Sequence, residues 1–158
     1  MVTDVDRAHL RRCVELARAA LDGGNSPFGS LLVGSQGTVL FEDHNRDAEG
    51  DRTRHPEFSI ARWAVAHLGP KQRSAATVYT SGEHCPMCAA AHAWAGLGRI
   101  VYATSSDQLR GWWGELGAAP APVAPLPIAQ VAPGIRAEGP VEEFAEEVRD
   151  LQRRYHQD

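Results

Sequence analysis

Residues 77–103, TVYTSGEHCPMCAAAHAWAGLGRIVYA, place two short apolar strands on either side of an alanine-rich helix. We expect the strands at 77–80 and 99–103 and the helix at 86–97. Pro86 fits the first turn of this helix, because the N–H group that proline lacks has no partner there. A strand, a helix and a second strand in this order form a parallel crossover, in which the helix covers one face of a sheet. The stretch therefore predicts an α/β fold.

The preceding residues extend the same pattern. Leu10, Val14, Ala17 and their neighbours recur at helical spacing and predict a helix over 4–21. Strands are expected at 29–33 and 38–42, joined as a hairpin by the glycine-bracketed residues 34–37. A polar loop and a helix over 56–68 then lead to the strand at 77. The whole order predicts helices on both faces of a mixed sheet.

The C-terminal part differs in composition from the rest. Residues 118–133 are rich in proline and predict an extended arm. Over 140–158, Val141, Phe144, Val148, Leu151 and Tyr155 recur at steps of three and four, which predicts an amphipathic helix. This helix either packs on its own domain or is exchanged with a second subunit. We expect one domain over residues 1–158.

Two short motifs coincide with predicted helix starts, His55-Pro56-Glu57 and Cys85-Pro86-Met87-Cys88. One imidazole and two thiolates are suitable ligands for zinc, and three protein ligands leave the fourth tetrahedral position open for a reactive water. Glu57 is a carboxylate well placed to move protons at that water. Cys-x-x-Cys alone also suits a thioredoxin-like redox pair or a structural site. The combination of both motifs favours a hydrolytic zinc site at His55, Cys85 and Cys88.

His-x-Glu followed by Pro-Cys-x-x-Cys is the signature of the zinc deaminases. On Asn25–Ser30, Asn45, His55–Glu57 and Tyr79–Cys88, the chain resembles the cytidine deaminase superfamily, and bacterial guanine deaminases within it. The resemblance covers about residues 5–115. It implies a three-layer α-β-α sandwich with a central mixed five-stranded sheet.

The resemblance also implies a reaction, the zinc-dependent hydrolytic deamination of an amino-substituted heteroaromatic ring. Glu57 would take a proton from water at the metal and return protons to a ring nitrogen and to departing ammonia. The expected substrate is a free nucleobase or a related small heterocycle, such as guanine, cytosine, isocytosine or an amino-triazine. A nucleoside deaminase or a deaminase of adenosine in transfer RNA is the first alternative. A non-catalytic zinc protein or a thiol redox protein is the second.

Six residues are candidates for substrate contacts: Phe28, Asn45, His84, Trp113, Glu115 and Tyr155. Asn45 offers an amide donor and acceptor to a base edge, and Phe28 and Trp113 offer rings for stacking. Glu115 is a possible second carboxylate for a pair of N–H groups. In relatives the C-terminal segment covers the partner's active site, which would make Tyr155 a lid residue. Each candidate also has a purely structural reading, as a turn former, core residue or surface residue.

His84 stands where the family usually has proline, directly before the first cysteine. Proline would stiffen the approach to the metal, so its replacement affects the rigidity of the loop and the choice of substrate. His84 would face the substrate, compete as a ligand or point to solvent.

Composition restricts the partners and the compartment. The 158 residues carry a formal net charge of −4 and no run of basic residues, which argues against a nucleic-acid substrate despite Arg46, Arg52 and Arg54 near the motifs. No apolar run reaches membrane-spanning length, and residues 1–6 lack the features of a secretory signal. Three cysteines, two of them proposed ligands, favour a reducing cytoplasm. We expect a cytoplasmic homodimer that acts on a small heterocyclic base.

Overall fold

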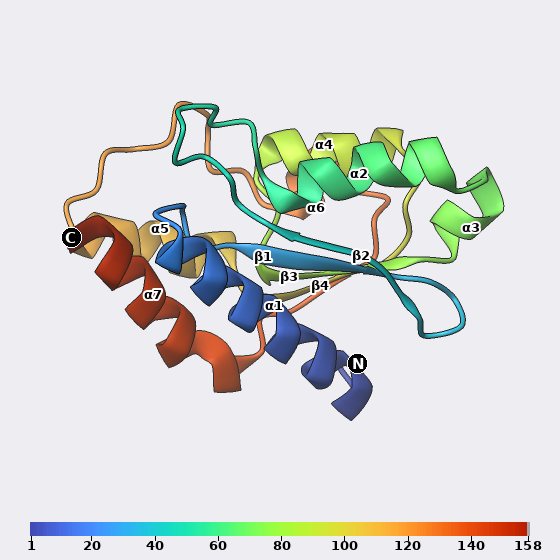
Figure 1. The fold of residues 1–158 in the computed structure, drawn as a ribbon, viewed down its shortest axis with the longest axis horizontal. Helices are drawn as coiled ribbons and strands as arrows, with labels where there is room; N and C mark the ends of the chain where they lie inside the picture. The colour runs from blue at the N-terminus through green and yellow to red at the C-terminus, as the bar shows by residue number, and fades with distance from the viewer. Residues whose placement is uncertain (158) are drawn as a thin grey trace.

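The computed structural model describes residues 1–157 and consists of three layers, with a sheet between two layers of helices (Figure 1). The five strands follow the order β2-β1-β3-β4-β5 across the sheet. Their bounds are β1 Gly29–Val33, β2 Val39–His44, β3 Thr77–Gly82, β4 Ile100–Thr104 and β5 Ala137–Glu138. β1 is antiparallel to β2 and β3, whereas β3, β4 and β5 are parallel. The predicted α/β class with a mixed five-stranded sheet is confirmed.

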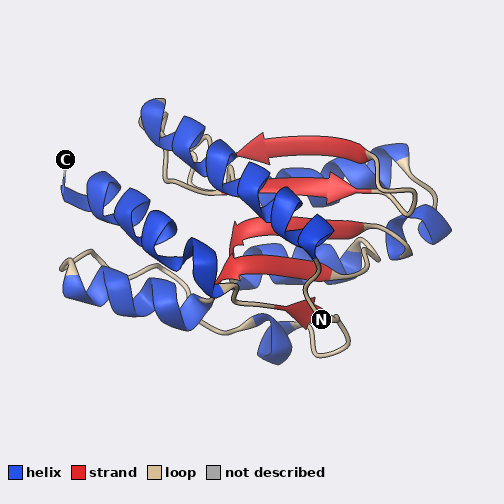
Figure 2. Ribbon diagram, turned by 90° about the horizontal axis from the view of Figure 1, so that it is seen from below, coloured by secondary structure: helices blue, strands red, loops and turns tan. Residues whose placement is uncertain are grey.

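Helices cover both faces of the sheet. One face carries α1 (Asp4–Asp22), α5 (Ser106–Glu115) and α7 (Ala145–Gln157), and Figure 2 looks onto this face, with α1 crossing in front of the strands. The other face carries α2 (Pro56–His67), α3 (Pro70–Ser74), α4 (Pro86–Trp94) and α6 (Ile128–Val131) (Figure 1). A short 3-10 helix, Glu142–Phe144, leads into α7.

Each face has its own apolar core. Leu10, Val14, Leu31 and Phe144 belong to the core between the sheet and α1 and α7. The core on the opposite face lies between the sheet and α2, and it includes Leu32, Ile60, Ala64 and Val78. Burial of these side chains is the main force that holds the three layers together.

β1 approaches α1 closely at Gly29. A Cβ atom at this position would lie 2.5 Å from Leu16 Cβ and 2.7 Å from the Ala17 backbone nitrogen. Such distances are shorter than any van der Waals contact, so only glycine fits here. The start of β1, directly before Ser30, is therefore packed tightly against α1.

The structure adds elements that the sequence pattern did not predict. α3 and α5 were not expected, and α4 ends at Trp94 rather than at residue 97. The proline-rich segment 118–133 contains the short helix α6, and β5 has two residues only, too few to show a periodic pattern. α5 begins with a capping box at Ser105 and Gln108, a signal that was present in the sequence.

The C-terminal helix α7 lies against α1 and α5 of the same chain. Arg11 and Arg18 of α1 both pair with Glu147 of α7, at 2.6 and 2.9 Å. The last residue of the predicted helix, Asp158, lies outside the described residues. Exchange of the C-terminal helix between two subunits stays a prediction.

Among residues 1–157, no helix combines the length and the apolar composition that crossing a bilayer requires. The expected cytoplasmic location stays a prediction.

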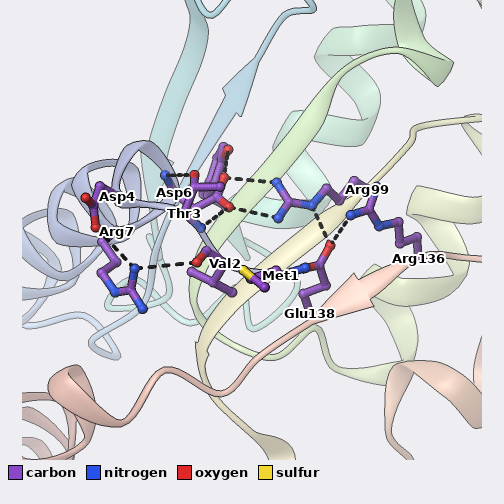
Figure 3. A network of polar contacts seen from close by, with 10 residues as sticks. Met1, Val2, Thr3, Asp4, Asp6, Arg7, Arg99, Arg136 and Glu138 are labelled. Atoms are coloured by element: carbon purple, nitrogen blue, oxygen red, sulfur yellow. Dashed lines mark hydrogen bonds and ion pairs between the residues drawn. The ribbon is translucent and has the colours of Figure 1, made fainter.

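An ion-pair network joins α1, β4 and β5 at the edge of the sheet where β4 begins (Figure 3). Arg99 donates two hydrogen bonds of 2.9 Å to the buried Asp6 carboxylate and one of 2.8 Å to Glu138. The Tyr79 hydroxyl donates to Asp6 at 2.6 Å. Hydrogen bonds from Arg99 hold the pKa of Asp6 well below its usual range and lower the pKa of Glu138 to about 2. Both carboxylates therefore stabilise the fold in their ionised form.

We expect Asp6→Asn to lower the free energy of unfolding at pH 7 by about 2 kcal/mol, because the charged Arg99 guanidinium loses its ionised partner and meets only a neutral amide. Asp107→Asn, which removes an exposed pair with Arg110, is the control and should change little. The measurement is urea unfolding followed by circular dichroism. Equal losses in the two variants would contradict the prediction.

The same network predicts the response of stability to acid. The two carboxyls have lower pKa values in the folded chain than in the unfolded chain, where the pKa values are about 4. Their stabilisation is therefore complete above about pH 5 and is lost as the pH falls toward about 2. The urea concentration at the unfolding midpoint should therefore decrease between about pH 5 and about pH 2, and it should decrease less in Asp6→Asn than in the parent chain.

Candidate active site

Two helix N-termini meet at one end of the sheet. His55 is the N-cap of α2, Cys85 is the N-cap of α4, and each is followed by proline in the first helical position. α2 packs along α4, so the two starts lie side by side (Figure 1). The positive end of a helix dipole favours thiolates and other anions. This end of the sheet is therefore suited to hold negatively charged ligands and a cation between them.

His55, Cys85 and Cys88 form a compact group of potential metal ligands. Nδ1 of His55 lies 3.5 Å from Sγ of Cys85 and 3.5 Å from Sγ of Cys88. All three ligand atoms lie within 4.8 Å of one another. In a tetrahedral site with Zn–S bonds of about 2.3 Å and Zn–N bonds of about 2.0 Å, the nitrogen–sulfur separation is about 3.5 Å. The two nitrogen–sulfur distances thus fit a zinc ion.

The electrostatics of the group favour a cation. A hydrogen bond from Cys88, followed by one from His55, lowers the pKa of Cys85 to about 4, against the opposing effect of burial. Burial alone would lower the pKa of His55, but Cys85 and then Glu57 raise it to about 9. A thiolate beside a protonated imidazole marks a place where positive charge is stabilised. A divalent cation supplies this charge in place of the imidazole proton.

Glu57 lies in the first turn of α2 and is 6% exposed. Its Oε1 accepts hydrogen bonds from the Thr80 hydroxyl at 2.8 Å and the Ser30 hydroxyl at 3.0 Å. Burial raises the pKa of Glu57, although His55 and Thr80 act in the opposite direction. A buried carboxyl of raised pKa, with its orientation fixed by two hydroxyls, is suited to accept and return a proton.

Ser30 and Thr80 are functional candidates that the sequence reasoning missed. They are direct partners across β1 and β3, and their hydroxyl oxygens lie 2.9 Å apart. Both are fully buried. For Ser30, the available signal was a hydroxyl residue inside the otherwise apolar strand β1, because a buried hydroxyl requires a partner.

Phe28 and Asn45 lie on two loops that are fastened together. The Asn45 backbone N–H donates to the Phe28 carbonyl at 3.0 Å, and the Ala48 N–H donates to the Asn25 side chain at 2.8 Å. Phe28 packs over Gly82, where a Cβ atom would lie 2.9 Å from Phe28 Cε1. Both candidates are therefore held near the end of β3 that leads to the cysteines.

His84 is buried rather than turned to solvent. Its ring meets His92 of α4 edge to face, with 5.4 Å between centroids. Burial lowers the pKa of His84, and it lowers the pKa of His92 to about 4, so both rings are neutral. Nδ1 of His84 has no hydrogen-bond partner among residues 1–157. A contact between His84 and a substrate stays a prediction.

The other three candidates lie on α5 and α7. The Trp113 indole donates to Gln152 at 2.8 Å, and the Gln152 amide donates to the Pro27 carbonyl at 3.4 Å, which connects Trp113 with the Phe28 loop. Glu115 is exposed and pairs with Arg149. Tyr155 lines a shallow surface pocket with Leu21 and Gly24. The roles proposed for these residues from the sequence stay predictions.

Glu83 is a further residue that the sequence reasoning missed. One carboxylate oxygen accepts from the Ser106 N–H at 2.9 Å, and the other accepts from the Ile128 N–H at 2.8 Å. It therefore fastens the starts of α5 and α6 to the loop that carries Cys85. The proline-rich segment 118–133 is therefore anchored at Ile128, within its second half.

Comparisons with known proteins agree with this geometry. The model of one family, the cytidine and deoxycytidylate deaminase zinc-binding region, matches residues 3–104. A probable cytosine deaminase of Schizosaccharomyces pombe is 33% identical over 110 residues, 68% of this chain and 65% of that protein. A tRNA-specific adenosine deaminase of Agrobacterium fabrum is 37% identical over 87 residues, 54% of this chain and 57% of that protein. The chain thus spans less than two thirds of the length of these relatives.

Solved structures show the same arrangement of elements. Guanine deaminase from Bacillus subtilis superposes with a TM-score of 0.59 at 29% identity, over 77% of this chain and 82% of that one. Guanine deaminase from Nitrosomonas europaea superposes with a TM-score of 0.70 at 23% identity, over 100% of this chain and 87% of that one. The second likeness concerns the fold alone.

We expect one zinc ion per chain, held by His55, Cys85 and Cys88. Cys88→Ser should lower the zinc content strongly, whereas Glu57→Gln should retain it, because Glu57 is not part of the ligand group. Metal analysis after dialysis measures both. Cobalt substitution adds an independent readout, since thiolate coordination produces a charge-transfer absorption. Zinc retained in Cys88→Ser, or lost in Glu57→Gln, would contradict the assignment.

Proposed function

Because the chain belongs to the family of the cytidine and deoxycytidylate deaminase zinc-binding region, we propose that it hydrolyses the exocyclic amine of a free nucleobase or related amino-heterocycle. The resemblance to the cytidine deaminase superfamily predicted from the motifs is thereby confirmed. The observation that carries the proposal is the buried Glu57 carboxylate beside the His55, Cys85 and Cys88 group.

The chemistry of the chain's own residues is proton transfer. A zinc ion held by His55, Cys85 and Cys88 would acidify a water molecule to a pKa of about 7. Glu57 accepts the proton of that water, and burial stabilises the protonated carboxyl that results. It would deliver that proton to the ring nitrogen as the C–O bond forms. It would then take the remaining proton from the added hydroxyl and pass it to the amine, so that the C–N bond breaks and ammonia leaves. Ser30 and Thr80 keep the carboxylate oriented through both transfers.

Substrate contacts are proposed first at Asn45 and Phe28. Both lie on the fastened loops beside β3, where Asn45 presents an amide to a ring edge and Phe28 a face for stacking. Trp113 is linked to the same loop through Gln152. The other three candidates contact residues elsewhere. His84 packs against His92, Glu115 pairs with Arg149, and Tyr155 lies beside the end of α1. We therefore place them after Asn45 and Phe28.

A deaminase of adenosine in transfer RNA, or of a nucleoside, is the second candidate function. The similarity to the Agrobacterium fabrum enzyme favours it. The net charge of −4 opposes it, since a polyanionic substrate requires a basic surface. A non-catalytic zinc protein or thiol redox protein has no need of a buried acid such as Glu57.

The test is ammonia release by the zinc-loaded protein from guanine, cytosine, isocytosine, ammeline, adenine, the matching nucleosides and a transfer RNA anticodon stem. We expect turnover of one or more free bases. Glu57→Gln should lower kcat by about 10²- to 10⁴-fold because proton transfer is lost. Glu49→Gln, an exposed acid on the neighbouring loop, is the matched control. Activity on nucleosides or RNA alone would contradict the free-base proposal in favour of the second candidate function. Full activity of Glu57→Gln would contradict the proposed role of Glu57 in proton transfer.

We also propose that the chain forms a homodimer through the outer face of α4. Trp94 at the end of this helix is 92% exposed, an unusual state for the largest apolar side chain. Residues 86–94 contain no charged side chain. In a two-fold contact the same patch meets itself, so an uncharged helix avoids repulsion between like charges.

Trp94→Glu should therefore convert the dimer to a monomer. Light scattering coupled to size-exclusion chromatography measures the mass. Val123→Glu, a charge added at another exposed apolar side chain, is the control and should remain dimeric. A monomeric parent chain, or an unchanged mass in Trp94→Glu, would contradict the proposed interface.

A further inference from the structure

An open groove of about 470 Å³ lies between the edge strand β2 and the first half of α2. Its walls include Phe41 from β2, Arg54 from the loop before α2, and Phe58, Arg62 and Trp63 from α2. Arg54 directly precedes the candidate ligand His55. The groove is thus close to the metal site in the chain, but none of the metal-ligand residues lines it.

One wall of the groove is a rigid aromatic stack. The rings of Phe41 and Trp63 are parallel within 1°, with 5.3 Å between centroids. His67 stacks on Trp63 at 4.5 Å, and its Nδ1 lies 2.8 Å from the Trp63 carbonyl oxygen. These rings already hold one another in place. Binding of a flat ligand would therefore cost little conformational entropy of the side chains that form this wall.

The groove also carries two exposed guanidinium groups. Arg54 and Arg62 are exposed and line the groove, and among residues 1–157 neither forms a salt bridge. Asp51 is an acid close to this charge, since hydrogen bonds from Thr53 and then the charge of Arg54 lower its pKa. Most other arginines are paired, including Arg12, which binds Glu42 of the same strand β2. An arginine free of carboxylates keeps its five N–H donors available for an incoming anion.

We propose that this groove binds a nucleoside monophosphate, with the base against the aromatic side chains and the phosphate on Arg54 and Arg62. Aromatic walls select a flat ring, and guanidinium groups bind phosphate in paired hydrogen bonds. The volume suits a single small ligand. A longer nucleic acid fits less well, because the chain has a net charge of −4 and no run of basic residues beyond the groove. This inference does not depend on which ring is deaminated.

The test is isothermal titration of the zinc-loaded protein with guanosine monophosphate, guanosine and inorganic phosphate. The monophosphate should bind about tenfold more tightly than either fragment, since it uses both the aromatic and the cationic walls. Arg62→Gln should weaken its binding by about tenfold. Arg54→Gln should have a similar effect. Arg154→Gln on α7 removes the same charge outside the groove and should leave the affinity unchanged.

Several outcomes would overturn the inference. Guanosine or phosphate binding as tightly as the monophosphate would exclude joint recognition of base and phosphate. An equal loss in Arg62→Gln and Arg154→Gln would indicate a general charge effect. A change of mass in solution for Arg62→Gln would assign the groove to a subunit contact, and tighter binding of a short RNA would assign it to a polynucleotide. Ammonia release from a free base should persist in Arg62→Gln, which separates this test from that of the deaminase proposal.

Discussion

The side-by-side packing of α2 and α4 is the constraint on which the rest of the site depends. Each helix begins at a candidate metal ligand, so their contact brings His55 within 3.5 Å of Cys85 and Cys88 although thirty residues separate them. Proline in each first turn starts the helix without losing a hydrogen bond. The apolar core beneath α2 and α4 packs both helices on the sheet, and so keeps their N-termini close to the end of β3.

The acid at the site is a second constraint, because a carboxylate is costly to bury without partners. Ser30 and Thr80 meet this demand from two adjacent strands at the centre of the sheet. Gly29, the residue before Ser30, packs tightly against α1 on the other face of the sheet. The position of Glu57 therefore depends on packing across both faces of the sheet, and it is more rigid than a residue on a free loop would be.

Loops around the site are held by polar anchors rather than by an apolar core. Asn25 holds the Ala48 backbone, Glu83 holds the starts of α5 and α6, and Gln152 connects Trp113 with Pro27. Each anchor joins segments that are far apart in the chain. The ion pairs of Asp6, Arg99 and Glu138 lie where β4 begins (Figure 3). The metal ligands Cys85 and Cys88 follow the end of β3, which is parallel to β4, so the network and the candidate site lie at opposite ends of the strands.

The sequence by itself determined the order of the principal elements, the mixed α/β class, the family and the set of candidate metal ligands. These follow from local signals: periodic apolar residues, proline and glycine at element ends, and thiols and imidazole at helix starts. Only the tertiary structure decided that Ser30 and Thr80 orient Glu57, that His84 is buried against His92, and that β5 joins the sheet. The physical reason is that these features depend on contacts between distant residues, which no local pattern of the chain encodes.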